Sequence, residues 1–438
     1  MKLIKRSLVA ALFTLTSCAD GVWVGLDSKV KLEGERLPIT NVINSPSYHP
    51  KEILLPAPIK NSGWYKSNSV TSAEVQNLFL TEPLQLDKKF SIATNENFSA
   101  AATPIIVNGK MYVADSDGLI QAFDIATGNS VWISEYFITL SKKSIFDTFQ
   151  GKYLNGGISY HAGLIFVTSG LGEVVALSET DGSLVWGHKL SSPSRATPLA
   201  TDAGLVLFQT IDNKVYALDI KTGDVVWGHV GISDEINLLQ TYSPISFEQQ
   251  IIVQYTSGDL YALDLMSGQE IWAQNINPAI DHLGQTTKLQ NVLTSPTIAS
   301  GNVYAFSNDG YIASINAQSG QMNWKERLRI NKQIWIAGGT IFGVNTSNKI
   351  LAINASNGNL IWELDAIENN EKSGYLNAPI IANNKLLIVS SIGQLFYINP
   401  NKPVIEATIA VVSDVHLPPM VSDGELYLVS DDGYIAKY

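Results

Sequence analysis

The sequence predicts an all-β protein, an eight-bladed β-propeller of four-stranded antiparallel blades whose ring is closed by an N-terminal strand. The main observation is a spacing that occurs six times: a small residue, a glycine six positions later and a tryptophan ten positions later. The copies are Ala122/Gly128/Trp132, Ala176/Gly182/Trp186, Ala217/Gly223/Trp227, Ala262/Gly268/Trp272, Ser314/Gly320/Trp324 and Ala352/Gly358/Trp362. Repeats of roughly 40–50 residues, each with several short strands, are typical of propeller blades.

Each repeat has the same order of strands and turns, as residues 204–227 illustrate. An apolar run at 205–208 suits a buried strand, and Asp212-Asn213 suits a tight turn because Asn tolerates a positive φ. Residues 214–219 alternate as a half-buried strand does, and a glycine turn at 221–224 leads into the strand that carries Trp227. The other copies have Gly118, Gly172, Gly258, Gly310, Asn348 and Gly393 at the first turn. We expect the six indoles to fill the spaces between neighbouring blades.

Two further units bring the count to eight. The seventh, residues 386–407, lacks the glycine turn and the tryptophan, and the eighth ends at Tyr438 without an outer strand. An open blade would leave an unpaired edge, so another segment is needed to complete it. Residues 84–92 have strand character and no blade of their own, and we expect them to pair with the last blade. Seven blades is the alternative count.

The N-terminus indicates export and lipidation. Basic residues precede a short apolar stretch, Ser7–Leu15, which is too short to span a bilayer. Cys18 is the one cysteine of the chain and follows small residues, as in bacterial lipoprotein signals. We therefore expect residues 1–17 to be a signal peptide, Cys18 to carry the lipid, residues 18–60 to form a flexible tether and residues 61–438 to form the propeller. An ordinary cleaved signal peptide is the alternative.

Charge and motifs exclude several function classes. The net charge of −11 argues against nucleic acid as a partner and against electrostatic adhesion to anionic lipid, so the lipid anchor is the expected link to the membrane. The six histidines show no metal-ligand spacing, and no nucleophile elbow or haem motif occurs. Asp124, Asp219 and Asp264 lie where they can accept hydrogen bonds from turn amides. We predict no catalytic residues, no metal and no cofactor.

Residues 217–227 match the docking motif of pyrroloquinoline-quinone dehydrogenase propellers, although this chain lacks their cysteine pair and haem motif. The lipoprotein signal, short tether and eight blades with a degenerate seventh resemble the BamB family, lipoprotein subunits of the outer-membrane β-barrel assembly machinery. The start at Asn61-Ser62-Gly63-Trp64 resembles alphaproteobacterial members. The resemblance implies a non-enzymatic scaffold anchored in the outer membrane and facing the periplasm. It implies the POTRA domains of BamA and other subunits of the machinery as partners, with unfolded outer-membrane proteins as a further hypothesis.

The resemblance also implies which loops bind the partner. Family members use a Leu-x-Leu-Arg segment, whose place is held here by Ile236, Leu238 and Leu239, so the apolar positions are kept and the arginine is absent. A second element has two aspartates, where this chain has Asn291 and Leu293. Ile236 and Leu238 have an alternative interpretation as strand-edge core residues. A quinone-dependent dehydrogenase and a propeller that binds cell-wall polymers are the alternative functions.

Overall fold

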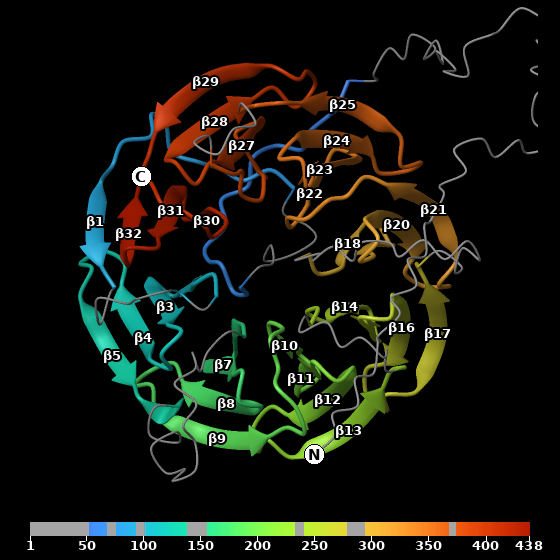
Figure 1. Ribbon diagram of the computed structural model, residues 1–438. Helices are drawn as coiled ribbons and strands as arrows, with labels where there is room; N and C mark the ends of the chain where they lie inside the picture. Colours follow the sequence, from blue (N-terminus) through green and yellow to red (C-terminus); the bar gives the residue numbers. More distant parts are fainter. Residues whose placement is uncertain are drawn as a thin grey trace, which may run out of the picture. The chain divides into compact units, whose positions relative to one another are not determined.

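The computed structural model describes residues 52–67, 76–92, 100, 102–137, 156–232, 241–277, 294–367 and 374–438. The described residues lie in one compact unit, Pro50–Tyr438. They form eight four-stranded antiparallel sheets, which follow one another around a ring (Figure 1). The predicted fold class, an eight-bladed β-propeller, is confirmed.

The first four blades run from the innermost to the outermost strand in chain order. Blade 1 contains β2 (Ile105–Val107), β3 (Lys110–Ala114), β4 (Ile120–Asp124) and β5 (Ser130–Ser134). Blade 2 contains β6 (Ile158–His161), β7 (Leu164–Thr168), β8 (Glu173–Ser178) and β9 (Leu184–Lys189). Blade 3 contains β10 (Leu199–Ala200), β11 (Leu205–Thr210), β12 (Lys214–Asp219) and β13 (Val225–Val230). Blade 4 contains β14 (Ile245–Phe247), β15 (Gln250–Gln254), β16 (Asp259–Asp264) and β17 (Glu270–Asn275).

The remaining blades continue this order, and the last one takes its outer strand from the N-terminal side. Blade 5 contains β18 (Thr297–Ala299), β19 (Asn302–Phe306), β20 (Tyr311–Asn316) and β21 (Met322–Arg327). Blade 6 contains β22 (Trp335–Ala337), β23 (Thr340–Val344), β24 (Ile350–Asn354) and β25 (Leu360–Leu364). Blade 7 contains β26 (Ile380–Ala382), β27 (Lys385–Val389), β28 (Gln394–Ile398) and β29 (Ile405–Ala410). Blade 8 contains β30 (Met420–Ser422), β31 (Glu425–Ser430), β32 (Tyr434–Lys437) and β1 (Lys88–Ser91).

The ring is closed by β1, which pairs antiparallel with β32 so that Phe90 lies opposite Ile435. Just outside the strand, the amide of Asp87 donates to the carbonyl of Lys437 at 2.9 Å, and the side chains of these two residues form an ion pair at 3.0 Å. The predicted closure by residues 84–92 is therefore confirmed, with the strand itself limited to Lys88–Ser91. The added strand removes the unpaired edge that β32 would otherwise expose.

The repeated small residue lies directly opposite the tryptophan in its own blade. Ala217, for example, pairs with Trp227 across β12 and β13, and the register shifts by one residue immediately after Ala217. The same shift follows Ala122, Ala176, Ala262, Ser314, Ala352 and Tyr397 in the other blades with a complete third and fourth strand. A small side chain at this point leaves room for the indole on the same face of the sheet.

Each of the six tryptophans contacts the following blade. Trp186 Nε1 donates to the carbonyl of Ile220 in blade 3 at 3.0 Å, and its ring lies over Gly223. A methyl group at Gly223 would lie 2.7 Å from Trp186 Cδ2, closer than carbon atoms pack, and the φ of Gly223 is +76°. Equivalent indole hydrogen bonds join Trp132 to Glu179, Trp227 to Leu265, Trp272 to Ala317, Trp324 to Ala355 and Trp362 to Pro400.

Blade 7 reverses this arrangement, because Tyr397 stands in the place of the small residue and Ala407 in the place of the tryptophan. The junction between blades 7 and 8 thus has no indole and leaves an apolar cavity of ≈ 300 Å³ lined in part by Leu84, Leu86 and Ile409. Tyr438 also lines the cavity, and its hydroxyl accepts a hydrogen bond from the amide of Val412 at 2.8 Å. The C-terminal residue therefore supports this junction in place of a tryptophan.

The described N-terminal residues lie along the inner strands of several blades. The amide of Trp64 donates to Ile106 in β2 at 2.7 Å, and the amide of Leu78 donates to Ile381 in β26 at 2.9 Å. Ile53 is buried, and its amide donates to Asn401 Oδ1 at 2.6 Å. The predicted tether boundary at residue 60 is therefore wrong for residues 52–60, which pack on the propeller. Prolines and charges gave these residues the appearance of a linker, whereas their partners are remote in the sequence.

The predicted turn residues have the expected backbone. Asn213 has a φ of +56° and Asn348 a φ of +61°, at the turns between the second and third strands of blades 3 and 6. The corresponding glycines, Gly118, Gly172, Gly258, Gly310, Gly393 and Gly433, also have positive φ. Asn and Gly are the residues that tolerate this conformation best, so the first turn of each repeat is confirmed.

The predicted role of the turn aspartates is also confirmed. Asp219 Oδ1 accepts hydrogen bonds from the amides of Lys221 and Thr222 at 2.8 and 3.0 Å. Asp264 and Asp124 form equivalent bonds in blades 4 and 1. The hydrogen bonds to the ionised form lower the pKa of all three carboxyls below the ordinary value of 3.8. In blades 5 and 6 the same place is taken by Asn316 and Asn354, whose side-chain oxygens accept hydrogen bonds from the following amides.

We expect the triple variant Asp124→Asn, Asp219→Asn, Asp264→Asn to lose less stability in acid than the wild type. Because folding lowers these pKa values, the stabilisation is present above the ordinary pKa and disappears as the pH falls through and below it. Urea unfolding at pH 7 and at pH 3, followed by tryptophan fluorescence, measures the difference. Asp224→Asn, beside the same turn as Asp219, is the control. Equal acid sensitivity of the triple variant and the wild type would contradict the prediction.

Candidate partner-binding face

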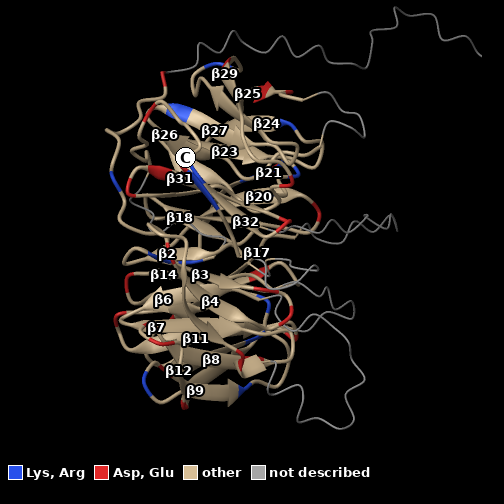
Figure 2. Cartoon of the chain, turned by 90° about the vertical axis from the view of Figure 1, so that its left-hand side faces the viewer, with Lys and Arg blue, Asp and Glu red and all other residues tan. Residues whose placement is uncertain are grey.

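Every connection between successive blades begins and ends on one face of the ring. Because the four strands of a blade are antiparallel, the outer strand ends on the same face on which the next inner strand begins. The turns between second and third strands, such as residues 211–213, lie on this face too. We call it the connection face. Figure 2 views the ring edge-on and shows many charged residues along both of its edges, with strands between them.

The predicted partner-binding residues belong to two connections between blades. Ile236, Leu238 and Leu239 fall in residues 233–240, and Asn291 and Leu293 fall in residues 278–293, all outside the described residues, as is Cys18. The first connection runs from β13 to β14 and the second from β17 to β18. Both start and end on the connection face, over blades 3, 4 and 5. Their assignment as contact residues stays a prediction.

The residues that flank the first connection are apolar and exposed. Val230, the last residue of β13, is 67% exposed, and Ile232 is 61% exposed. Tyr242, on the far side of the connection, is buried, and its hydroxyl donates to Asn308 Oδ1 at 3.1 Å in blade 5. Val230 and Ile232 thus form a short exposed apolar edge beside the first connection.

A buried histidine network joins blades 3 and 4 below this edge. His229 Nδ1 lies 2.6 Å from Tyr255 Oη, and His229 Nε2 lies 2.9 Å from Glu270 Oε1. A methyl group at Gly231 would lie 2.4 Å from the Tyr255 ring, so the chain passes close to that ring. Burial raises the pKa of the Tyr255 hydroxyl. The sequence identified His229 only by its place after Trp227, since its partners lie 26 and 41 residues away.

Side-chain amides connect the blades nearer the centre of the ring. Gln209 Nε2 in blade 3 donates to the carbonyl of Gln254 in blade 4 at 2.7 Å, and Gln254 Nε2 donates to the carbonyl of Phe306 in blade 5. Asn213 Nδ2 donates to Thr256 Oγ1 at 2.9 Å. Buried hydrogen bonds of this kind fix the relative positions of neighbouring blades. The framework that carries the two connections is therefore stiff.

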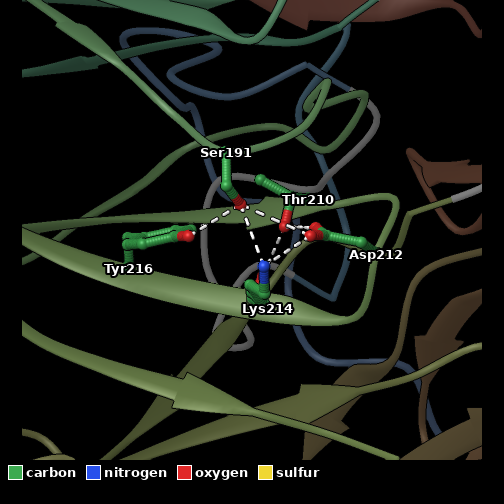
Figure 3. A network of polar contacts seen from close by, with 5 residues as sticks. All are labelled: Ser191, Thr210, Asp212, Lys214 and Tyr216. Carbon is green, nitrogen blue, oxygen red and sulfur yellow. Dashed lines mark hydrogen bonds and ion pairs between the residues drawn. The ribbon is translucent and has the colours of Figure 1, made fainter. Parts of the chain in front are cut away.

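A polar network of blade 3 and of the connection that precedes it lies on the same face (Figure 3). Lys214 Nζ lies 2.7 Å from Asp212 Oδ2 and 3.2 Å from Ser191 Oγ, and Ser191 Oγ lies 2.9 Å from Tyr216 Oη. Partial burial works to raise the pKa of Asp212, but the hydrogen bonds from Lys214 and Thr210 outweigh it and lower that pKa. The network holds the turn between β11 and β12 against the connection that enters β10.

The described residues contain no group of three or more His, Cys, Asp or Glu side chains placed to hold a metal ion. Within the same part of the chain, no helix has the length and apolar character needed to cross a bilayer.

A family model described as outer membrane protein assembly factor BamB matches residues 139–364 and 347–438, which is more than half of the chain. The chain belongs to the BamB family. The BamB of Salmonella typhimurium is 27% identical over 334 residues, covering 76% of this chain and 82% of that protein. The BamB of Escherichia coli is 26% identical over 341 residues, covering 77% and 84%.

Solved structures agree on the fold. The crystal structure of BamB from Moraxella catarrhalis superposes with a TM-score of 0.64 at 18% identity, covering 81% of this chain and 99% of that one. A quinohemoprotein alcohol dehydrogenase from Comamonas testosteroni superposes equally well, with a TM-score of 0.64 at 13% identity over 86% and 80% of the two chains. At such low identities these similarities show the propeller fold alone. The family match is what distinguishes BamB from the dehydrogenases.

Proposed function

We propose that the protein is a non-catalytic scaffold lipoprotein of the outer-membrane β-barrel assembly complex. The observation that carries the proposal is the match to the BamB family over most of the chain. The ring geometry supports it, because inter-blade bonds hold a broad connection face on which the connections between blades begin and end. A rigid platform with exposed loops suits the binding of other proteins, and the partners are the POTRA domains of BamA and other subunits of the complex.

The proposed location is the periplasmic side of the outer membrane. Cys18 would carry the lipid, and docking to BamA would supply the second anchoring interaction that stable peripheral attachment needs. The propeller would then hold the periplasmic domains of the partner and assist the folding and insertion of outer-membrane proteins. The outer edges of the blades could add a strand from an unfolded barrel protein by β-augmentation.

Affinity purification of the tagged full chain from detergent-solubilised envelopes tests the proposal. We expect BamA and other subunits of the complex to be recovered with the wild-type protein. Recovery of the protein without any subunit of the assembly complex would contradict the scaffold function. Bound quinone together with dye-linked alcohol oxidation would instead support the dehydrogenase alternative.

The variant Leu238→Asp is expected to reduce the recovery of BamA by about tenfold or more, because a buried charge at an apolar contact costs several kcal/mol. Quantitative blotting of the purified complexes measures the loss. Leu184→Asp is the matched control, since Leu184 is 45% exposed on the outer strand β9, away from the connection face. Unchanged recovery of BamA with Leu238→Asp would mean that the contact lies elsewhere. The scaffold function is tested separately, by the recovery of BamA with the wild-type protein.

A further inference from the structure

A run of cations leads from blade 5 to blade 6, at the junction that follows the second of the predicted BamA connections. Residues 325–332 hold four cations, Lys325, Arg327, Arg329 and Lys332, in a chain whose net charge is −11. None of the four forms an ion pair with a carboxylate among the described residues. The run leads from β21 of blade 5 across the connection face to blade 6. Cations without acidic partners in an acidic protein indicate a surface for an anionic ligand.

The run ends in a polar cavity between blades 6 and 7. The cavity has a volume of ≈ 340 Å³, and its lining includes Asn331, Lys332, Asn345, Asn348 and Tyr375. Lys332 Nζ lies 5.0 Å from the centre of the Tyr375 ring. The lining is mostly polar, with Val344 as its one large aliphatic side chain.

The turn of blade 6 forms a fixed wall of this cavity. Asn345 Oδ1 accepts hydrogen bonds from the amides of Ser347 and Lys349, both at 3.0 Å. Asn348 Oδ1 accepts one from the amide of Leu376 at 2.8 Å. The oxygens of both amide side chains are thus used within the protein, which keeps the wall in one conformation.

Three polar groups of the lining residues have no polar partner among the described residues. Asn331 Oδ1 and the Tyr375 hydroxyl are buried and form no hydrogen bond there. The Lys332 ammonium has no ion pair there, and burial lowers its pKa. The Tyr375 ring also contacts His416, at 5.0 Å between ring centres, and His416 pairs with Asp431. Buried polar groups without partners are uncommon, and a bound ligand would supply partners for these.

The donors and acceptor define the chemistry of that ligand. An ammonium and a phenolic hydroxyl both donate to an anionic oxygen, whereas Asn331 Oδ1 accepts from an N–H. A carboxylate next to a peptide N–H supplies both the anionic acceptor oxygen and the N–H donor. The volume of the cavity suits an acidic side chain or the C-terminal end of a peptide. The mostly polar lining argues against an acyl chain as the ligand. The single ammonium of Lys332 matches the charge of a carboxylate better than that of a phosphate.

We propose that this cavity binds the carboxylate of an acidic peptide segment of a partner protein. The carboxylate accepts from Lys332 and Tyr375, and a neighbouring peptide N–H donates to Asn331. The site lies over blades 6 and 7, so it is separate from the predicted contacts over blades 3 to 5 and does not depend on them. It would let the ring hold a second polypeptide while the first is bound.

Fluorescence anisotropy with the full chain in detergent tests the site. The probes are fluorescein-Gly-Ser-Glu-Ser-Gly-amide, the same peptide with Gln in place of Glu, and the Gln peptide with a free C-terminal carboxylate. We expect the two carboxylate peptides to bind about tenfold or more tightly than the neutral one. Equal affinity for all three would overturn the proposal. Effective competition by inorganic phosphate alone, or binding only to phosphatidylglycerol vesicles, would overturn it in favour of phosphate or lipid.

Variants connect binding to the cavity. Lys332→Met is expected to abolish the preference for carboxylate, and Tyr375→Phe to weaken binding about threefold to tenfold while keeping the ring. Lys325→Met removes a cation from the same run outside the cavity and is expected to change affinity by less than about twofold.

Discussion

Replacing Trp186 with alanine is expected to lower the free energy of unfolding by about 3–5 kcal/mol. Trp186 is only 7% exposed, and its ring packs near Phe166 and Phe208, with ring centres 6.0 and 6.4 Å away. The substitution leaves a cavity between blades 2 and 3 and removes the hydrogen bond to Ile220. The indole is a main contact between these two blades, so its loss weakens their junction directly.

Urea unfolding monitored by far-ultraviolet circular dichroism measures this effect. Val185→Ala is the control, because Val185 is adjacent in β9 but 46% exposed, and we expect a change of about 0.5 kcal/mol or less. A loss below about 1 kcal/mol for Trp186→Ala would mean that the indole is not a main inter-blade contact.

Replacing Gly223 with alanine is expected to lower the free energy of unfolding by about 2–4 kcal/mol, as the sum of backbone strain and overpacking. The φ of +76° disfavours any residue with a Cβ, and that atom would lie 2.7 Å from Trp186. Gly204→Ala separates the two causes. Gly204 has a φ of +83° in the same blade, but a methyl group there meets no atom within 4 Å, so we expect about 1 kcal/mol.

The combination of Trp186→Ala and Gly223→Ala provides a further check. Without the indole, the added methyl group has space, so Gly223→Ala should cost no more than Gly204→Ala in that background. The two substitutions should therefore be less destabilising together than the sum of their separate effects. Strict additivity would show that the glycine is required for its backbone conformation alone.

The repeats and the ring closure were predictable because their causes lie in the local sequence and in the count of strands per blade. A turn that needs positive φ selects Gly or Asn, as at Asn213 and Gly223, and a strand that faces an indole selects a small residue such as Ala217. The missing strand of blade 8 could be matched to residues 84–92 because only that segment had strand character and no blade. The hydrogen bonds of Asp219 to the amides of its turn could also be predicted, because they depend only on the spacing within the repeat.

The N-terminal residues and the carboxylate cavity could not be predicted in the same way. Ile53 and Asn401, or Lys332 and Tyr375, meet because separate blades bring them together, and no spacing relates them. Residues 52–60 have the composition of a linker, yet hydrogen bonds to the blades hold them in place. The histidine network of His229 has the same origin, since its partners come from the next blade.

The sequence by itself determined the kind of sheet, the repeating blade unit and the tryptophan that fills six of the junctions, because each of these blades repeats the same local requirements for turns and volume. The tertiary structure decided which polar groups face one another across blades. Only ring closure sets those distances, and it left Asn331, Lys332 and Tyr375 in one cavity with hydrogen-bonding capacity unused by the described residues. A binding site of this kind depends on the relative positions of whole blades, which no single repeat specifies.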